Sequence, residues 1–279
     1  MHIKCWGSRG SIPVSGAEYI KYGGDTTCLE IRNQEGDVII VDAGTGIRRL
    51  GNRLIEENLY RYHLIFTHAH WDHLMGFPYF KPLFLEHAIF HIHRCPFHDD
   101  FIRTMLSRML APPNFPVKYS ELTANLIYEQ SCPEPFRIGS VTIVPIPISH
   151  PNGGSGYKFI ENGKSFVFLT DNELGWRHPG GLDETAYIES CRGVDLLIHD
   201  AEYTPEEYRS YREWGHSTYT SALEVALRAG VKRLGLFHLN QDRSDDAMDA
   251  IVVDCRNRIR REDSTLDCFA VACGMTYDL

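Results

Sequence analysis

Short apolar runs separated by glycine-containing turns give the chain its most regular pattern. Residues 28–32 alternate apolar and polar side chains, 33–37 (NQEGD) have a turn composition, and 38–41 (VIIV) are continuously apolar. Alternation is typical of a half-buried strand, and a continuous run is typical of a fully buried one. Residues 47–55 follow a DAGTG loop and place their apolar side chains on one helical face. This region therefore predicts a hairpin, a buried strand and a helix.

Five apolar runs end at a histidine or an aspartate. The runs and the polar residues that follow them are 63–66 with THAHWDH (67–73), 140–148 with His150, 164–169 with Asp171, 195–198 with His199 and Asp200, and 233–237 with His238. Sheets that mix strands and helices usually carry their ligands at the carboxyl ends of strands. We therefore expect these side chains to gather at one edge of the fold.

Imidazole and carboxylate side chains in this number predict a metal site. A lone histidine after a strand is usually an ordinary packed or exposed residue, but here that interpretation would have to hold at five strand ends. Zinc-like ions bind imidazole nitrogens and carboxylate oxygens. Seven candidate ligands are enough for two metals with positions left open for water or substrate: His68, His70, Asp72, His73, His150, Asp171 and His238.

The same residues resemble the metallo-β-lactamase-fold hydrolases. The segment 67–73 looks like the signature of that family, Asp42 precedes it, and the later ligands follow in the family's order. The resemblance implies an α+β fold, a four-layer αββα sandwich of two mixed sheets flanked by helices, formed by residues 1–279 as a single domain. It also implies one metal held by His68, His70 and His150, a second held by Asp72, His73 and His238, and Asp171 as the bridge.

Such a site supports hydrolysis. Two divalent ions can activate a hydroxide and stabilise charge on a phosphoryl or acyl oxygen, so we count Asp72 among the catalytic residues as well as the ligands. Zinc is the expected ion, although Mn²⁺ and Fe²⁺ accept the same ligands. Asp42 either orients a ligating imidazole or serves as a turn residue.

Two segments favour phosphodiester cleavage. HDAE (199–202) and GHST (215–218) resemble the phosphodiesterase branch that contains ribonuclease Z and the cyclic-phosphate phosphodiesterases. That resemblance implies that His216 contacts the scissile phosphate and protonates the leaving oxygen with Asp200 as its acidic partner. A departing alkoxide needs this proton more than a thiolate does. In the alternative interpretation Ser217 or Thr218 only caps the following helix, and His216 lies on the surface.

Arg9 and Phe115 are further candidates for substrate contact. Arg9 lies in the glycine-rich segment WGSRGS (6–11), which also resembles this branch and could approach a phosphate. Phe115 follows a helix predicted over 101–110. Both lie in an insertion at 81–131, which forms either a lid over the metal site or a segment that only packs against the rest of the fold. Stacking on a base or ribose would suit Phe115.

Three histidines of the insertion invite a different hypothesis. His91, His93 and His98 lie in FHIHRCPFH, but no carboxylate accompanies them in a ligand pattern. We interpret them as ordinary surface residues.

Charge favours a small substrate. The chain of 279 residues has a formal net charge of -9, and residues 81–131 contain no lysine run that could grip transfer RNA. We therefore expect a small, cyclic phosphodiester, such as a cyclic nucleotide or cyclic phosphoribose, and large nucleic acid is not expected. The alternatives are an RNA 3′-processing endonuclease of the ribonuclease Z type and a thioester hydrolase of the glyoxalase type. The latter would need a helical domain after His238, where only 41 residues follow.

The remaining composition suggests a cytoplasmic protein. The eight cysteines show no CxxC spacing, and the first ten residues, MHIKCWGSRG, have no signal-peptide core. No stretch approaches the roughly 18 to 20 apolar residues of a membrane span. The resembled phosphodiesterases are often dimers, so a homodimer is also an expectation.

Overall fold

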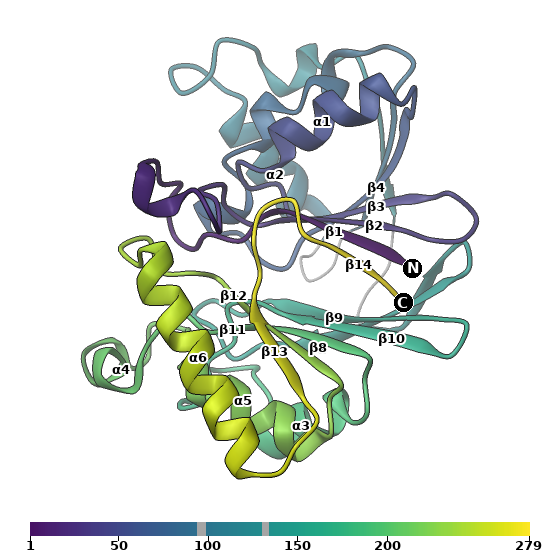
Figure 1. Cartoon of the computed structure of the whole chain (residues 1–279). Coiled ribbons are helices and arrows are strands. Elements are labelled where there is room, and N and C mark those ends of the chain that lie inside the picture. The colour runs from purple at the N-terminus through teal and green to yellow at the C-terminus, as the bar shows by residue number, and fades with distance from the viewer. Residues whose placement is uncertain (94–98, 130–133) are drawn as a thin grey trace.

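The computed structural model describes residues 1–93, 99–129 and 134–279 (Figure 1). Within these residues the strands form two seven-stranded sheets. In spatial order the N-terminal sheet contains β14 (Thr276–Asp278), β1 (His2–Gly7), β2 (Cys28–Arg32), β3 (Val38–Val41), β4 (Arg61–Ile65), β5 (Ile89–His93) and β6 (Asn125–Glu129). The C-terminal sheet contains β13 (Asp267–Ala270), β12 (Arg233–Phe237), β11 (Leu196–Asp200), β10 (Lys164–Leu169), β9 (Ser155–Glu161), β8 (Val141–Pro147) and β7 (Phe136–Ile138).

The two sheets pack face to face with helices on their outer surfaces (Figure 1). The continuous apolar run of β3 serves both faces of its sheet, because Val38 and Ile40 pack toward the helices while Ile39 and Val41 pack toward the other sheet. The expected four-layer αββα sandwich of mixed sheets is confirmed. The helices α1 (Ile47–Glu56) and α2 (Asp99–Met109) lie beside the N-terminal sheet, and α3 (Glu184–Cys191), α5 (Tyr219–Ala229) and α6 (Asp245–Arg261) lie beside the C-terminal sheet. The short helix α4 (Pro205–Tyr211) follows β11 in the chain.

Strand directions bring the ligand-bearing loops to one edge. Neighbouring strands run parallel from β3 to β6 and from β10 to β13, and β8 has the same direction as β10 because each is antiparallel to β9. The carboxyl ends of β3 and β4 in one sheet, and of β8, β10, β11 and β12 in the other, therefore carry the predicted functional residues.

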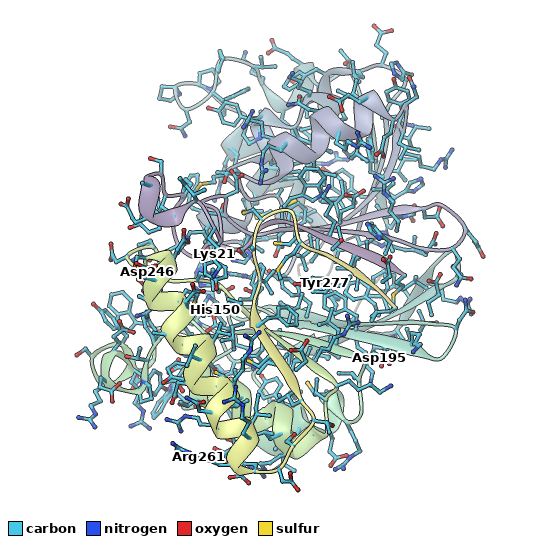
Figure 2. All side chains as sticks on the ribbon, viewed as in Figure 1. Lys21, His150, Asp195, Asp246, Arg261 and Tyr277 are labelled. Carbon is cyan, nitrogen blue, oxygen red and sulfur yellow. The ribbon has the colours of Figure 1, made fainter. Side chains whose placement is uncertain are left out.

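Contacts between distant parts of the chain fix the two halves together. The strand β14 pairs with β1, and the backbone N–H of Leu279 donates to the carbonyl of Met1 at 3.0 Å. Lys21 lies beside the first turn of α6, near Asp246 (Figure 2), and its backbone N–H donates to Asp245 at 2.7 Å. The N-terminal half is thus tied to a C-terminal helix and a C-terminal strand.

Most predicted elements are present with small shifts at their ends. The strands 164–169 and 233–237 have the predicted bounds, whereas β4 begins and ends earlier than expected. Pro145 and Pro147 lie in the part of β8 beyond its pairing with β7, which agrees with the edge position expected for prolines. None of the described helices is long and apolar enough to cross a membrane.

Candidate metal centre and acid pair

All seven candidate ligands gather where the ends of the two sheets meet, and His150 marks this place in Figure 2. They form two groups in which the ligand atoms lie within 4.8 Å of one another, and Asp171 belongs to both. The first group is His68, His70, His150 and Asp171, and the second is Asp72, His73, Asp171 and His238. These groups have the same members as the two ligand sets that the sequence resemblance implies.

The backbone turns sharply at three of the strand ends that carry site residues. Asp42, Asp171 and His238 have φ angles of 63°, 52° and 57°, in the left-handed region that non-glycine residues seldom adopt. This conformation costs free energy, about 1–3 kcal/mol at each residue, and occurs most often at functional sites. Here it accompanies the turn of these side chains into the space between the sheet ends.

Asp42 orients His73, as one of the two sequence interpretations expected. The Nδ1 of His73 lies 2.8 Å from the Oδ2 of Asp42, and Asp42 also accepts hydrogen bonds from the backbone N–H and the hydroxyl of Thr67, both at 2.7 Å. A proton held on Nδ1 leaves the Nε2 lone pair of the neutral ring free for a metal.

Glu202 orients His238, and the sequence interpretation did not assign it this role. The Nδ1 of His238 lies 2.9 Å from Glu202 Oε2, and its Nε2 lies 3.1 Å from Asp72 and 3.2 Å from Asp171. The sequence signal for this role was HDAE (199–202), in which two carboxylates, Asp200 and Glu202, lie two residues apart where β11 ends.

A backbone carbonyl orients His150. Its Nδ1–H donates to the carbonyl of Gly215 at 2.9 Å, which leaves Nε2 facing His70 at 3.0 Å. Gly215 has a φ of 97°, and a Cβ at this position would lie 2.1 Å from His150 Nδ1. Only glycine satisfies both the backbone conformation and the close approach.

The donor atoms fit divalent metal ions. The Nε2 atoms of His68 and His73 are buried and have no hydrogen-bond partner among the described residues, although Asp171 lies 3.5 Å and 3.2 Å away. Burial lowers the pKa of His68 and lowers that of His150 to about 3, so both rings are neutral, as metal ligands must be. Burial alone would raise the pKa of Asp171, but His238 and His73 hold it well below its usual value.

His216 and Asp200 form a buried pair beside the second group. The Nδ1 of His216 lies 2.8 Å from Asp200 Oδ2, and the rings of His216 and His238 stack with centroids 4.5 Å apart. Burial would lower the pKa of His216, but Glu202 and Asp200 raise it to about 9. Because His216 is only 8% exposed, the interpretation that placed it on the surface is wrong. Thr218 does cap α5 by accepting from Ser221, so that part of the alternative is correct.

Arg9 has a structural role that argues against the predicted substrate contact. Its side chain is 1% exposed, and its guanidinium donates to the backbone carbonyls of Asn240, Arg243 and Gly23 at 2.9, 3.1 and 3.0 Å. The reason is that residues 6–10 of this segment are buried, with Gly10 packed against His238, so Arg9 does not face solvent.

The same segment supports two ligands through its backbone. The N–H of Ser11 donates to Asp72 Oδ2 at 2.9 Å, and a Cβ on Gly10 would lie 2.2 Å from His238 Nδ1. The glycines therefore allow close approach to ligands, whereas the sequence suggested approach to a phosphate.

Phe115 lies in the part of the insertion that follows α2, and it packs against the apolar core between the N-terminal sheet and its helices. Its ring is half-buried and meets Tyr79 edge-on, with centroids 5.6 Å apart. Its stacking on substrate stays a prediction, as does the lid role of residues 81–131. The helix α2 itself does lie beside the loop 67–74 that carries four candidate ligands (the metal loop), because the two line a common pocket.

The histidines of β5 differ from the surface residues that we expected. His93 is 5% exposed and stacks on Phe136, and His91 has a carboxylate partner in Glu129 at 2.7 Å. Glu129 belongs to the adjacent strand β6 and Phe136 to β7 of the other sheet, and a single sequence does not reveal such contacts. His98 lies outside the described residues.

Comparison with known proteins places the chain in a family. A family model described as "Beta-lactamase superfamily domain" matches residues 38–239. Ribonuclease Z of Geobacillus kaustophilus is 26% identical over 243 residues, which cover 70% of this chain and 75% of that protein.

Two solved structures share the fold. The metallo-β-lactamase-fold protein YhfI from Bacillus subtilis has a TM-score of 0.70 at 17% identity, with 99% of this chain and 98% of that chain covered. The short form of human tRNase Z has a TM-score of 0.66 at 18% identity, with 100% and 99% covered. The chain therefore belongs to the metallo-β-lactamase superfamily and is a metal-dependent hydrolase, similar in sequence to ribonuclease Z.

Proposed function

We propose that the protein hydrolyses a small, cyclic phosphodiester, such as a cyclic nucleotide or a cyclic phosphoribose. The two groups that share Asp171 would hold two divalent ions, zinc first. Ions at this position would supply the activated water and stabilise negative charge on the phosphoryl oxygens. The remaining chemistry falls to side chains of the chain itself.

The observation that carries the proposal is the placement of His216. Asp200 holds Nδ1 of this ring, so Nε2 is the nitrogen that remains for substrate. The N–H of Ser217 donates to the other oxygen of Asp200 at 2.8 Å, which keeps the carboxylate fixed. A protonated His216 would donate from Nε2 to the leaving alkoxide and take the place of bulk water as the acid.

The test compares two leaving groups. In His216→Ala we expect turnover of a natural phosphodiester to fall by about 10²–10⁴-fold, the usual contribution of a general acid. Turnover of bis(p-nitrophenyl) phosphate should fall much less, because nitrophenolate leaves without a proton. Equal losses on both substrates would contradict the acid role.

A helix-cap variant provides the matched control. Thr218→Ala removes the cap of α5 and should lower stability by about 1 kcal/mol without changing the ratio of the two rates. If Thr218→Ala shifts that ratio as much as His216→Ala does, the effect comes from displacement of the loop.

RNA 3′-end processing is the second candidate, and the similarity to ribonuclease Z favours it. A product assay separates the candidates with 3′,5′- and 2′,3′-cyclic nucleotides, a 1,2-cyclic phosphoribose, precursor transfer RNA and S-lactoylglutathione. Cleavage of cyclic phosphodiesters supports the small-substrate proposal, and cleavage of precursor transfer RNA alone supports the second candidate. Thioester cleavage alone would overturn both.

A further inference from the structure

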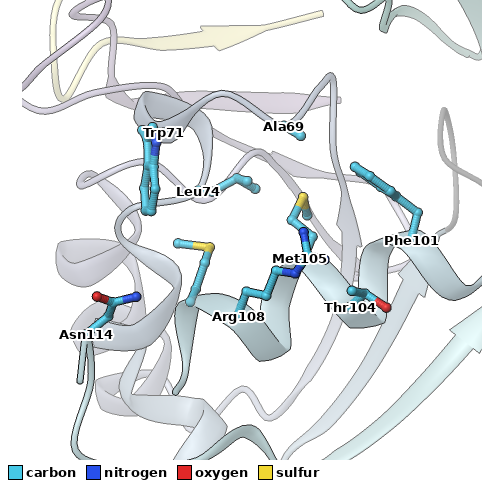
Figure 3. Close-up of a pocket in the computed structure, with 9 residues that line it drawn as sticks. Ala69, Trp71, Leu74, Phe101, Thr104, Met105, Arg108 and Asn114 are labelled. Carbon is cyan, nitrogen blue, oxygen red and sulfur yellow. The ribbon is translucent and has the colours of Figure 1, made fainter. Parts of the chain in front are cut away.

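A pocket of about 680 Å³ lies between the metal loop and α2. Its walls are mostly apolar and include Leu74, Met105 and Met109. Trp71 and Phe101 stand on opposite sides of it (Figure 3) and are 68% and 48% exposed. The volume lies in the range of small-molecule sites, and two exposed aromatic rings beside a hollow are typical of ligand recognition.

The pocket adjoins the metal centre through the chain itself. Ala69 and Trp71 line it, and they alternate in sequence with the ligands His68, His70 and Asp72. Each of these two lining residues is joined by a peptide bond to a candidate ligand, so a substituent of a substrate bound at the ligands would extend toward this pocket.

Arg108 is the charged side chain among the residues that line this mostly apolar pocket. Arg108 extends from α2 toward the metal loop (Figure 3), and it forms no ion pair or hydrogen bond with the described part of the chain. A guanidinium offers only donors, in a planar fork. The complementary ligand is therefore flat and apolar on its faces, and it presents acceptor atoms along one edge.

We infer that this pocket binds the nucleobase of a nucleotide whose phosphodiester lies at the metal ligands, with guanine preferred over adenine. This inference names the substrate class of the proposed phosphodiesterase and rests on that proposal for its catalytic meaning. Guanine presents two acceptors, O6 and N7, to an arginine fork, whereas adenine pairs N7 with a donor that the guanidinium cannot accept. Trp71 and Phe101 supply the stacking faces, which suit any base.

Binding is measured first, because it does not depend on turnover. The metal-loaded full chain is titrated with guanosine and with adenosine by isothermal calorimetry. We expect guanosine to bind about fivefold to a hundredfold more tightly, the range for one bidentate arginine contact. Arg108→Gln should abolish that preference.

Arg103 of the same helix provides the matched control. Its guanidinium stacks on Tyr128 at 4.9 Å and does not line the pocket. Arg103→Gln should leave the preference for guanosine unchanged. Equal affinities of the wild-type chain for both nucleosides, or equal effects of the two substitutions, would overturn the inference.

Turnover then separates this inference from the proposed function. We expect a higher kcat/KM for 2′,3′-cyclic GMP than for 2′,3′-cyclic AMP, and Arg108→Gln should remove that difference without changing the rate on base-free 1,2-cyclic phosphoribose. If all cyclic phosphodiesters are left intact while guanosine still binds through Arg108, the proposed function fails and the base site stands. A short RNA ending in guanosine, tested beside the cyclic nucleotide, distinguishes an RNA end from a free nucleotide as the source of the base.

Discussion

The two halves of the sandwich contribute to the candidate metal centre in different ways. The N-terminal half supplies four candidate ligands from one loop after β4, within six consecutive residues. The C-terminal half supplies one candidate ligand at the end of each of three strands, namely His150 after β8, Asp171 after β10 and His238 after β12. The first arrangement is local in sequence, and the second exists only when the sheet is assembled.

The supports of the ligands differ in the same way. In the N-terminal half Asp42 holds His73, and Thr67, at the start of the metal loop, holds Asp42. In the C-terminal half Glu202 holds His238 and also lies 3.4 Å from Nδ1 of His216. Asp42 therefore supports a candidate ligand alone, whereas Glu202 contacts both a candidate ligand and the acid His216.

Replacement of Asp171, which belongs to both groups, should have the largest effect, because it disturbs both halves of the centre at once. Asp171→Asn affects both groups, so we expect loss of both metals and a fall in kcat/KM of at least about a thousandfold, because bound metal contributes several kcal/mol. His68→Ala should likewise remove metal and activity together. Elemental analysis of purified variants measures the metal content.

A histidine outside both groups controls for general damage. His63 is half-buried in β4 and belongs to neither group, so His63→Gln should keep the wild-type metal content. Retention of two metals per chain by His68→Ala would contradict the assignment of the first group.

Replacement of Asp42 or Glu202, the carboxylates that orient His73 and His238, should have a smaller effect that differs between the two halves. Asp42→Asn and Glu202→Gln should each weaken metal affinity by about 10–100-fold, the usual effect of losing a partner that orients a ligand. Only Glu202→Gln should also change the ratio of rates on natural and nitrophenyl phosphodiesters, because only Glu202 lies beside His216. Competition with a chromogenic chelator measures the affinities.

A buried carboxylate away from the site serves as the control for both variants. Glu30 accepts a hydrogen bond from Trp6 at 2.8 Å, and Glu30→Gln should leave metal affinity unchanged. An altered ratio of rates in Asp42→Asn would mean that the N-terminal half also acts on the acid.

Sequence alone predicted much of the fold and the gathering of the candidate ligands, for a physical reason. Strands such as β3 and β10 have apolar patterns because they are buried. The segment THAHWDH (67–73) places four candidate ligands in one loop. Both signals are local.

The missed features depend on assembled contacts. Glu202 has a role only because β11 and β12 are adjacent, and the Gly215 carbonyl matters only because it reaches His150 from a distant loop. Arg9 was assigned by charge, but burial decides its role. A sequence shows directly which charged and polar groups are present. It shows less readily which of them are buried in the folded chain.

The smallest expected effect lies at His93, away from the metal centre in the N-terminal sheet. Burial, aided by His63 and His91, lowers the pKa of His93 to about 3, so the ring is neutral in the folded chain. The unfolded chain takes up this proton near pH 6.5, and the free energy of unfolding therefore falls as pH drops from about 7 toward 3. Between pH 7 and pH 5 this group accounts for up to about 2 kcal/mol. His93→Phe should flatten the dependence in urea titrations at these two pH values, whereas His87→Phe, at an exposed histidine, should not. An unchanged slope in His93→Phe would mean that folded and unfolded wild-type chains protonate His93 equally easily. The pKa of His93 would then contribute nothing to the pH dependence of stability.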